Sequence, residues 1–299
     1  MSSTAVKHDA RSVAQAPVPV TAPTPPPAPK TLRIGPRPHA PRHRFALAKP
    51  VPGGILLGPA LLLLAWIIGA WANWLDPRVL PAPWTVAQTF WQLAADGRLE
   101  SNFATSAVRA GEGLAFGTVA GVVVALFSGL TRMGEYLLDG LVQVKRAVPV
   151  LALIPLLVMW LGIGEPMKVV IIAISVFLPI YMQLHFALRG IESRYIELAC
   201  VLRLNYFQFL RWIVLPGALA GFLLGLRLAV AAAWIALVVV EQINATSGIG
   251  YMISLAGTYG QTDIIIAGLV VYAVLGLTAE VLVRLLAKAL LPWQRTFAG

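Results

Sequence analysis

Charged side chains inside long apolar segments are the residues of this chain whose type and position could support chemistry. Arg227 lies in the apolar segment 217–240, eleven residues after Pro216, or about 16 Å along a helix. A charge at the centre of a lipid bilayer costs ~3 kcal/mol, so in a membrane protein Arg227 must face protein or water. Two roles stay open for it. It forms an internal ion pair, for which Glu280 in segment 264–286 is a candidate partner, or it attracts an anion along a transport path.

The usual groupings of catalytic, metal-binding and nucleotide-binding residues are missing from the sequence. Cys200 has no second cysteine, and the four histidines never pair at metal-ligand spacing. No G-x-x-x-x-G-K-[ST] phosphate loop occurs. We therefore expect no catalytic residue, metal or cofactor on this chain. If ATP drives its function, the nucleotide binds to a partner subunit.

The composition is that of a membrane protein. Hydrophobic residues make up 58%, charged residues 12%, and the mean hydropathy is +0.78. The apolar runs are long and do not alternate, which favours spanning helices over a β-barrel. We predict an all-α polytopic membrane protein with about six transmembrane helices. One segment is short, contains Pro149 and Pro155, and is expected to extend back into 136–147. The six segments are 54–74, 107–130, 148–163, 168–188, 217–240 and 264–286.

Basic residues are distributed unequally between alternate loops. Leaving out two arginines inside the spans, 18 Lys and Arg residues lie in one set of tails and loops and 3 in the other. By the positive-inside rule, both termini and the 131–147 and 189–216 loops are cytoplasmic, whereas 75–106 and 241–263 are external. This distribution accounts for most of the net charge of +10, so no nucleic-acid partner is needed to explain it.

The first 50 residues differ from the rest of the chain. Positions 17–29 contain seven prolines. Residues 1–50 contain eight Lys and Arg residues but only one acidic residue, Asp9. Such a composition predicts a disordered, basic cytoplasmic tail that contacts anionic lipid or a specific partner. The predicted units that follow are a first transmembrane helix at 51–75, an external loop with an interfacial helix at 76–103, and a membrane domain at 104–290.

Two of the apolar segments carry a small residue at every fourth position. This spacing places the small residues on one face of a helix, where a neighbouring backbone can approach closely. We therefore predict tight helix packing along both faces. These ladders of small residues are Gly113, Gly117, Gly121, Ala125 and Gly129 in the second segment, and Gly217, Gly221, Gly225, Ala229 and Ala233 in the fifth.

The external loops also carry structural signals. Pro83 followed by Val86, Phe90 and Leu93 on one face predicts a helix in the membrane interface. The 241–263 loop is polar and glycine-rich without Lys or Arg, which suits a mobile external gate or a docking edge. A purely structural role is the alternative for each loop. The candidate gate and docking residues are Glu241, Ser247, Gly248, Gly250 and Asp263.

The 197–216 stretch is a polar, arginine-bearing interruption between two apolar segments. Leu198 and Leu202 share one face of a predicted short helix. Asn205 followed by Gln208 predicts a capping box at the start of a second short helix. A Leu-Pro pair then closes the stretch where the chain returns to the membrane. Two short helices along the cytosolic surface would fit a cleft of a partner protein.

This stretch resembles the hallmark of the binding-protein-dependent ABC permeases of the type-1 importer group. That hallmark is a cytoplasmic Glu-Ala-Ala, then a glycine, then an apolar residue followed by Leu-Pro. Glu197, Leu198, Ala199 and Val214-Leu215-Pro216 occupy these positions at the right spacing. The similarity runs from about Leu80 to Trp293 and is strongest to the nitrate/sulfonate/taurine branch, above all to the aliphatic-sulfonate permeases. Its other marks are Leu80-Pro81-Ala82-Pro83, Ser106, Arg109, Gly113, the run at 151–156, Gly225-Leu226-Arg227, Glu241, the run at 247–251, and Thr262-Asp263.

Three positions depart from the family pattern. Arg203 stands in place of the motif glycine, Leu198 in place of the first alanine, and Ala220 in place of the usual second proline. Glycine would close the first short helix in a left-handed conformation, which costs another residue ~1 kcal/mol or more. Either the break therefore shifts toward Leu204-Asn205, or Arg203 gains a compensating contact, such as an acidic residue on the ATPase.

The resemblance implies a multi-pass permease with the type-1 importer transmembrane fold in the bacterial inner membrane. It implies a homodimer bound to two ATPase subunits, which hold ATP and Mg, and an external substrate-binding protein. The implied substrate is a small anion, foremost an alkanesulfonate, with taurine, nitrate or bicarbonate as alternatives. ATP-driven movement of helices at about 190–212 would switch the path between the two sides. The implied coupling residues are Glu197, Leu198, Ala199, Leu202, Arg203 and Pro216.

A secondary transporter or channel without an ATPase is the alternative from another functional class. It would not need a docking segment, and neither a proton relay nor an inverted repeat is evident in the sequence. A membrane receptor or scaffold that uses the basic tail is a third hypothesis. That hypothesis lacks an output domain to carry a signal.

Overall fold

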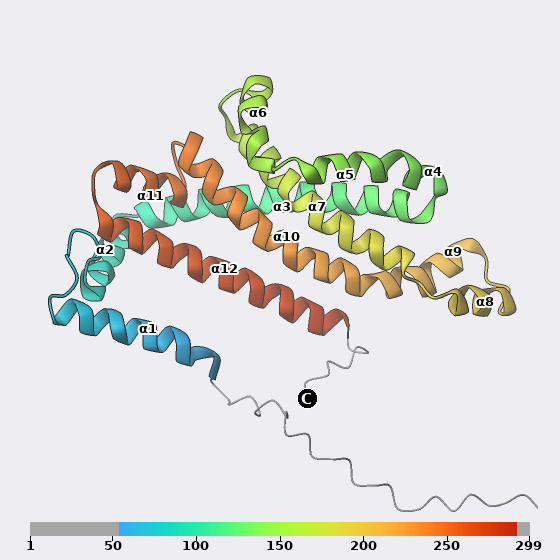
Figure 1. The fold of residues 1–299 in the computed structure, drawn as a ribbon, viewed down its shortest axis with the longest axis horizontal. Helices are drawn as coiled ribbons and strands as arrows, with labels where there is room; N and C mark the ends of the chain where they lie inside the picture. The colour runs from blue at the N-terminus through green and yellow to red at the C-terminus, as the bar shows by residue number, and fades with distance from the viewer. Residues whose placement is uncertain (1–53, 292–299) are drawn as a thin grey trace, which may run out of the picture. The chain divides into compact units, whose positions relative to one another are not determined.

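Residues 54–291 are described by the computed structural model, and over this range the chain is helical without a strand (Figure 1). Four long helices, α3 (Arg98–Leu130), α7 (Glu165–Arg189), α10 (Leu215–Asn244) and α12 (Thr262–Leu290), form its body. The basic tail predicted at 1–50 lies outside the described residues. The shorter elements are α1 (Gly54–Trp71), α2 (Pro83–Ala95), α4 (Arg132–Gly134), η1 (Glu135–Asp139), α5 (Gly140–Ala147), η2 (Val150–Leu153), α6 (Ile154–Leu161), α8 (Ser193–Val201), α9 (Tyr206–Phe209), η3 (Leu210–Val214) and α11 (Ile249–Thr258).

The long apolar helices confirm the predicted all-α polytopic fold. Among residues 54–291, four helices are long and apolar enough to cross a membrane, and a bent helix pair is a fifth candidate span. The predicted number was about six. The segment predicted as the first transmembrane helix is described from Gly54 onward as α1. Helix α2 starts at Pro83 as predicted and buries Val86 and Leu93, whereas Phe90 of the predicted face is exposed. Its position in the membrane interface stays a prediction.

The third predicted span is not one straight helix. The helical residues 132–147 and 150–161 meet at an angle of 90°. Between them, Val148 has an extended backbone, with φ −93° and ψ 117°, because the following Pro149 disfavours the helical conformation in the residue before it. The helix does extend back before 148, as the sequence predicts. The predicted third span is therefore bent at Val148 and Pro149, and the pair 132–147 and 150–161 is a candidate for one broken span.

Helix α7 lies between α3 and α10, and both ladders of small residues face it. A Cβ atom added to Gly117 of α3 would lie 2.5 Å from the carbonyl oxygen of Ala173. A Cβ atom added to Gly221 of α10 would lie 2.3 Å from the Cβ of Ala187. The helices therefore approach at a distance that only glycine permits. Gly113, Gly121 and Gly225 make similarly close approaches to α7, whereas Gly217 faces open space.

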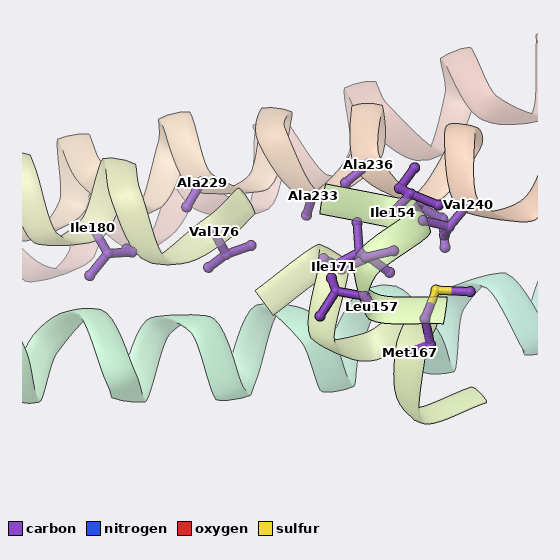
Figure 2. Packing of buried hydrophobic residues seen from close by; sticks show 12 residues of the cluster. Ile154, Leu157, Met167, Ile171, Val176, Ile180, Ala229, Ala233, Ala236 and Val240 are labelled. Carbon is purple, nitrogen blue, oxygen red and sulfur yellow. The ribbon is translucent and has the colours of Figure 1, made fainter. Parts of the chain in front are cut away.

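A buried apolar cluster joins α6, α7 and α10 (Figure 2). Branched side chains on α7, such as Ile171 and Val176, pack opposite alanines of α10, such as Ala229 and Ala233. Large side chains against small ones let the two helix surfaces interlock without voids. Ile154 and other residues of α6 complete the cluster, so the bent segment is part of the core rather than a peripheral loop.

We predict that Gly117→Ala destabilises the protein, because the new methyl group would overlap the backbone of α7. Overpacking of this kind costs about 1–3 kcal/mol. The free energy of unfolding, measured by denaturant titration in detergent micelles, should fall by that amount. Gly111→Ala is the matched control on the same helix, since a Cβ there meets nothing within 4 Å. Equal losses in the two variants would contradict the proposed packing of α3 against α7.

Candidate functional site

Helix α8 ends in a Schellman motif that is centred on Arg203. The N–H of Leu204 donates to the carbonyl of Ala199 (3.0 Å), and the N–H of Arg203 donates to the carbonyl of Cys200 (3.1 Å). Arg203 has a φ of +51°, the left-handed conformation that favours glycine. The break therefore does not shift to Leu204-Asn205. Arg203 takes the backbone conformation of the family's glycine and carries its ~1 kcal/mol cost.

The segment after this break begins with the predicted capping box. The side chain of Asn205 accepts from the N–H of Gln208 (2.8 Å), and the side chain of Gln208 accepts from the N–H of Asn205 (2.9 Å). Beyond it, Tyr206–Ile243 is one apolar helix of 38 residues. The expectation of a second separate helix that ends before Pro216 is therefore wrong. The π-helical turn η3 ends at Val214, two residues before Pro216, which lies in the first turn of α10, where a proline is tolerated.

Large apolar side chains point outward on α8 and on the turns that follow it. Leu198 is 48% exposed and Leu202 58%, whereas Ala199 faces inward and is buried. Charged residues such as Glu197 interrupt the same surface, so it differs from the lipid-facing surfaces of the spans. An exposed apolar surface with charges among it is typical of a protein-binding site. Its exposed apolar side chains are Tyr195, Ile196, Leu198, Val201, Leu202, Tyr206, Phe207 and Trp212.

Arg227 and Glu280 form an ion pair between α10 and α12. Nη2 of Arg227 lies 2.6 Å from Oε1 of Glu280, the partner that the sequence suggested. Nε of Arg284 donates to the same oxygen over 2.8 Å. This geometry favours the charge-scaffold alternative for Arg227. Its role in a transport path stays a prediction.

Figure 1 shows α11 at the opposite end of the long helices from α8. A second set of charges is buried near α11, at the start of α7 and the end of α10. Arg109 of α3 is 2% exposed, and all five of its N–H groups are used. Its Nη1 lies 2.8 Å from Oε1 of Glu241 in α10, and its Nε lies 2.5 Å from Oε2 of Glu165 in α7. Nη1 and Nη2 also donate to the carbonyl and hydroxyl oxygens of Ser247. Lys168 is buried and pairs with Glu165 at 2.8 Å.

Glu241 is the centre of this cluster and is fully buried. Besides Arg109, its carboxylate accepts from Ser106 Oγ (2.8 and 2.9 Å), the N–H of Gly250 (2.9 Å) and Tyr272 Oη (3.0 Å). A buried carboxylate is stable only with such a set of donors. The sequence placed Glu241 at an external gate or docking edge. The structure places it inside, where it ties α3, α11 and α12 to α10.

The 241–263 segment is largely helical, where the sequence suggested a mobile loop. It comprises the last turn of α10, helix α11 and the start of α12, and residues such as Ile249 and Met252 are buried against α2 and α12. Gly248 has a φ of +111°, and a Cβ there would lie 2.4 Å from Oε1 of Glu241. Asp263, at the start of α12, accepts from Thr89 of α2 over 2.7 Å. These residues therefore pack the end of the helix bundle, and their gating role stays a prediction.

Sequence analysis missed Glu165 and Lys168 as members of this cluster. Their spacing was a usable signal, since an acid and a base three residues apart at the start of an apolar helix pair on one face. Their link to Arg109 had no such signal, because 56 residues separate Arg109 and Glu165. Among the described residues, no group of three His, Cys, Asp or Glu side chains could hold a metal ion.

Comparison with known proteins agrees with these features. Residues 117–292 match the family described as binding-protein-dependent transport system inner membrane component. A Bacillus subtilis protein named as an aliphatic sulfonates transport permease is 35% identical over 271 residues, covering 91% of this chain and 96% of its own length. The Escherichia coli protein of the same name is 37% identical, covering 80% and 91%. The Escherichia coli taurine transport system permease protein is 33% identical, covering 78% and 87%.

A solved structure supports the fold independently. It is described as an amino acid ABC transporter with histidines, and it superposes with a TM-score of 0.55. The superposition covers 66% of this chain and 96% of that one at 17% sequence identity. At this identity the likeness concerns the fold alone. The helical arrangement is thus that of an ABC transporter chain.

We predict that Glu241→Gln lowers the free energy of unfolding by on the order of 3 kcal/mol. The substitution preserves shape but removes a buried counter-charge of Arg109 and places an amide N–H₂ among other donors. Denaturant titration in detergent micelles measures the loss. Glu112→Gln, an exposed position on α3, is the control and should change the free energy by less than about 0.5 kcal/mol. If both variants matched the unsubstituted protein, the cluster would not stabilise the bundle.

Proposed function

The chain belongs to the binding-protein-dependent transport system inner membrane component family, and on this basis we propose that it is the membrane permease of an ATP-driven importer of alkanesulfonates. The relatives named for this substrate align over nearly their whole length, which supports transport of the same class of anion. The taurine transport permease among the relatives is named for a substrate that is also a sulfonate. Taurine, nitrate and bicarbonate are the alternative substrates.

The observation that carries this proposal is the exposed surface of α8. It presents Leu198, Leu202 and Glu197 outward on a helix that a Schellman motif and a capping box hold in place. We propose that this surface docks a separate ATPase subunit, with Glu197, Leu198, Ala199, Leu202, Arg203 and Pro216 as the coupling residues. ATP and Mg would bind to that subunit, and this chain would carry no catalytic residue.

The charge distribution supports a cytoplasmic position for α8. Basic residues gather in the loops on its side of the spans, so we place both chain termini in the cytoplasm and α11 at the external surface of a bacterial inner membrane. An external binding protein would then deliver the anion at the α2–α11 end. Two copies of the chain with two ATPase subunits would complete the transporter.

Transport in this arrangement is alternating access. Closure of the ATPases would displace α8, and the continuous helix Tyr206–Ile243 would transmit that displacement toward Glu241 and α11. Ser247, Gly248, Gly250 and Asp263 would form the external gate or docking edge around that end. Arg227 and Glu280 would act as an internal charge scaffold that holds α12 to the moving helix.

The test is whether the purified chain co-isolates with an ATPase whose turnover rises when a loaded binding protein is added. Loading the binding protein in turn with an alkanesulfonate, taurine, nitrate or bicarbonate identifies the anion. We expect the largest stimulation with the alkanesulfonate. Uptake into vesicles that contain no ATPase would instead favour a secondary transporter.

Glu197→Lys should release the ATPase while the permease still folds. The side chain is exposed, so its loss removes no internal contact, and the reversed charge would oppose docking. Co-isolation should fall by about tenfold or more, which corresponds to a lost charge-assisted contact. Glu100→Lys, exposed on α3 at the opposite end of the bundle, is the control. Unchanged association and uptake in Glu197→Lys would refute the docking role.

Arg227→Ala should lower anion uptake, because it breaks the ion pair that joins α10 to α12. A part-exposed pair of this kind contributes ~1 kcal/mol, or about a fivefold effect. The triple variant R227E/E280R/R284E restores both contacts of residue 280 with reversed charges. A charge scaffold predicts that this triple variant recovers most of the uptake, whereas an anion-attracting role predicts that it does not. Uptake by Arg227→Ala at the level of the unsubstituted protein would exclude both roles.

A further inference from the structure

A groove between α10 and α12 combines apolar walls with three basic side chains. The groove has a volume of about 620 Å³, within the range of small-molecule sites. Arg227 of α10 and Arg284 and Lys288 of α12 line it together with apolar residues such as Leu224 and Val281. Nothing in the proposed transport mechanism uses Arg284 or Lys288.

The positive charge of this groove is only partly balanced. Arg227 and Arg284 contact the same oxygen of Glu280, at 2.6 and 2.8 Å, so one carboxylate serves two guanidinium groups. Lys288 has no carboxylate within ion-pair distance among the residues that the structure describes. The groove therefore keeps two unbalanced positive charges. The side chains of Arg227 and Arg284 are about half exposed, 48% and 56%, so their unused N–H groups can reach a ligand.

Arg284 and Lys288 lie near the end of α12, at the edge of a membrane. Arg227 contacts the same Glu280 oxygen as Arg284, which places it in this part of the groove rather than at the mid-membrane depth expected from counting residues after Pro216. Helix α12 ends at Leu290, so Lys288 and Arg284 lie about 3 and 9 Å from its end along the axis. Lipid headgroups occupy the zone at the ends of spanning helices. Basic pockets between spanning helices at this depth attract anionic headgroups.

A second cavity continues the seam toward the middle of the two helices. It has a volume of about 370 Å³ and is lined by apolar residues of α10 and α12 such as Val230, Ile235 and Gly276. It adjoins the first groove at Glu280, which lines this second cavity and contacts Arg227 and Arg284 of the first. The seam is thus basic near the end of α12 and apolar further in. This order matches a phospholipid, which carries a charged phosphate at one end and hydrocarbon chains at the other.

We propose that the α10–α12 groove binds an anionic phospholipid. Its phosphate lies among Arg227, Arg284 and Lys288, and one acyl chain follows the second cavity along the seam. A small free anion would use the cations but leave the apolar walls unfilled. A second copy of the chain would have to bury two unbalanced positive charges, which is costly without complementary acids. The lipid satisfies both parts of the groove.

The test measures lipid binding to the purified full chain. Native mass spectrometry in detergent records the fraction of lipid-bound chain during titration with phosphatidylglycerol or phosphatidylcholine. We expect the chain to retain phosphatidylglycerol in preference. The double variant R284Q/K288Q should weaken phosphatidylglycerol binding about 30-fold. Each cation near the membrane surface contributes about fivefold, and the variant removes two of them. The control R194Q/R211Q removes two exposed cations outside the groove and should change binding less than about twofold.

A conservative variant distinguishes the effect of the positive charges on lipid binding from the effect of side-chain shape. R284K/K288R keeps both charges and should retain phosphatidylglycerol within about threefold of the unsubstituted chain. If it loses as much binding as R284Q/K288Q, the loss reflects altered folding and the proposal fails. Equal binding of the two lipids also overturns it. Displacement of phosphatidylglycerol by inorganic phosphate or methanesulfonate would show a site for a small free anion, and crosslinking of two copies through this groove would show a dimer face.

Discussion

The close approach of α7 to α3 and α10 is the constraint on which the other contacts depend. In lipid, helices gain little from hiding apolar surface from each other, so association relies on close packing and on hydrogen bonds. Gly117 and Gly221 allow that packing because a methyl group at either position would overlap α7. The close fit also sets the register of the three helices. That register brings Glu165, at the first residue of α7, to Arg109 of α3 and places both beside Glu241 of α10.

The same helices connect the two ends of the bundle. The helix Tyr206–Ile243 begins next to the exposed surface of α8 and ends beside the buried charge cluster. A continuous helix of 38 residues is about 57 Å long, more than the ~30 Å of a bilayer core, so part of it extends beyond the membrane. Its π-helical turn η3 lies at that extension, and such turns are frequent at functional sites. We infer that a partner at α8 acts on the far end through this single element.

Local sequence patterns predicted those features that depend on neighbouring residues. The capping box of Asn205 and Gln208 was predicted because both partners lie within one turn of the same helix. The start of α2 at Pro83 followed from the fixed backbone angle of proline. The end of α8 shows the limit of such rules. The pattern located a break but left two sites for it, and the hydrogen bonds of Leu204 and Arg203 decided the choice in favour of Arg203.

The sequence by itself determined the all-helical membrane fold, the positions of the four long apolar helices and the family, since hydropathy, four-residue spacing and short motifs carry that information within one segment. Only the tertiary structure decided which charges meet. Arg109 and Glu241 are 132 positions apart, and Arg227 and Glu280 lie on different helices. Their pairing depends on how far one helix slides and turns against another, because hydrogen bonds tolerate only a few tenths of an ångström. The corner before Pro149 has a local cause in the proline, whereas the packing of α6 into the core of α7 and α10 is a property of the tertiary structure.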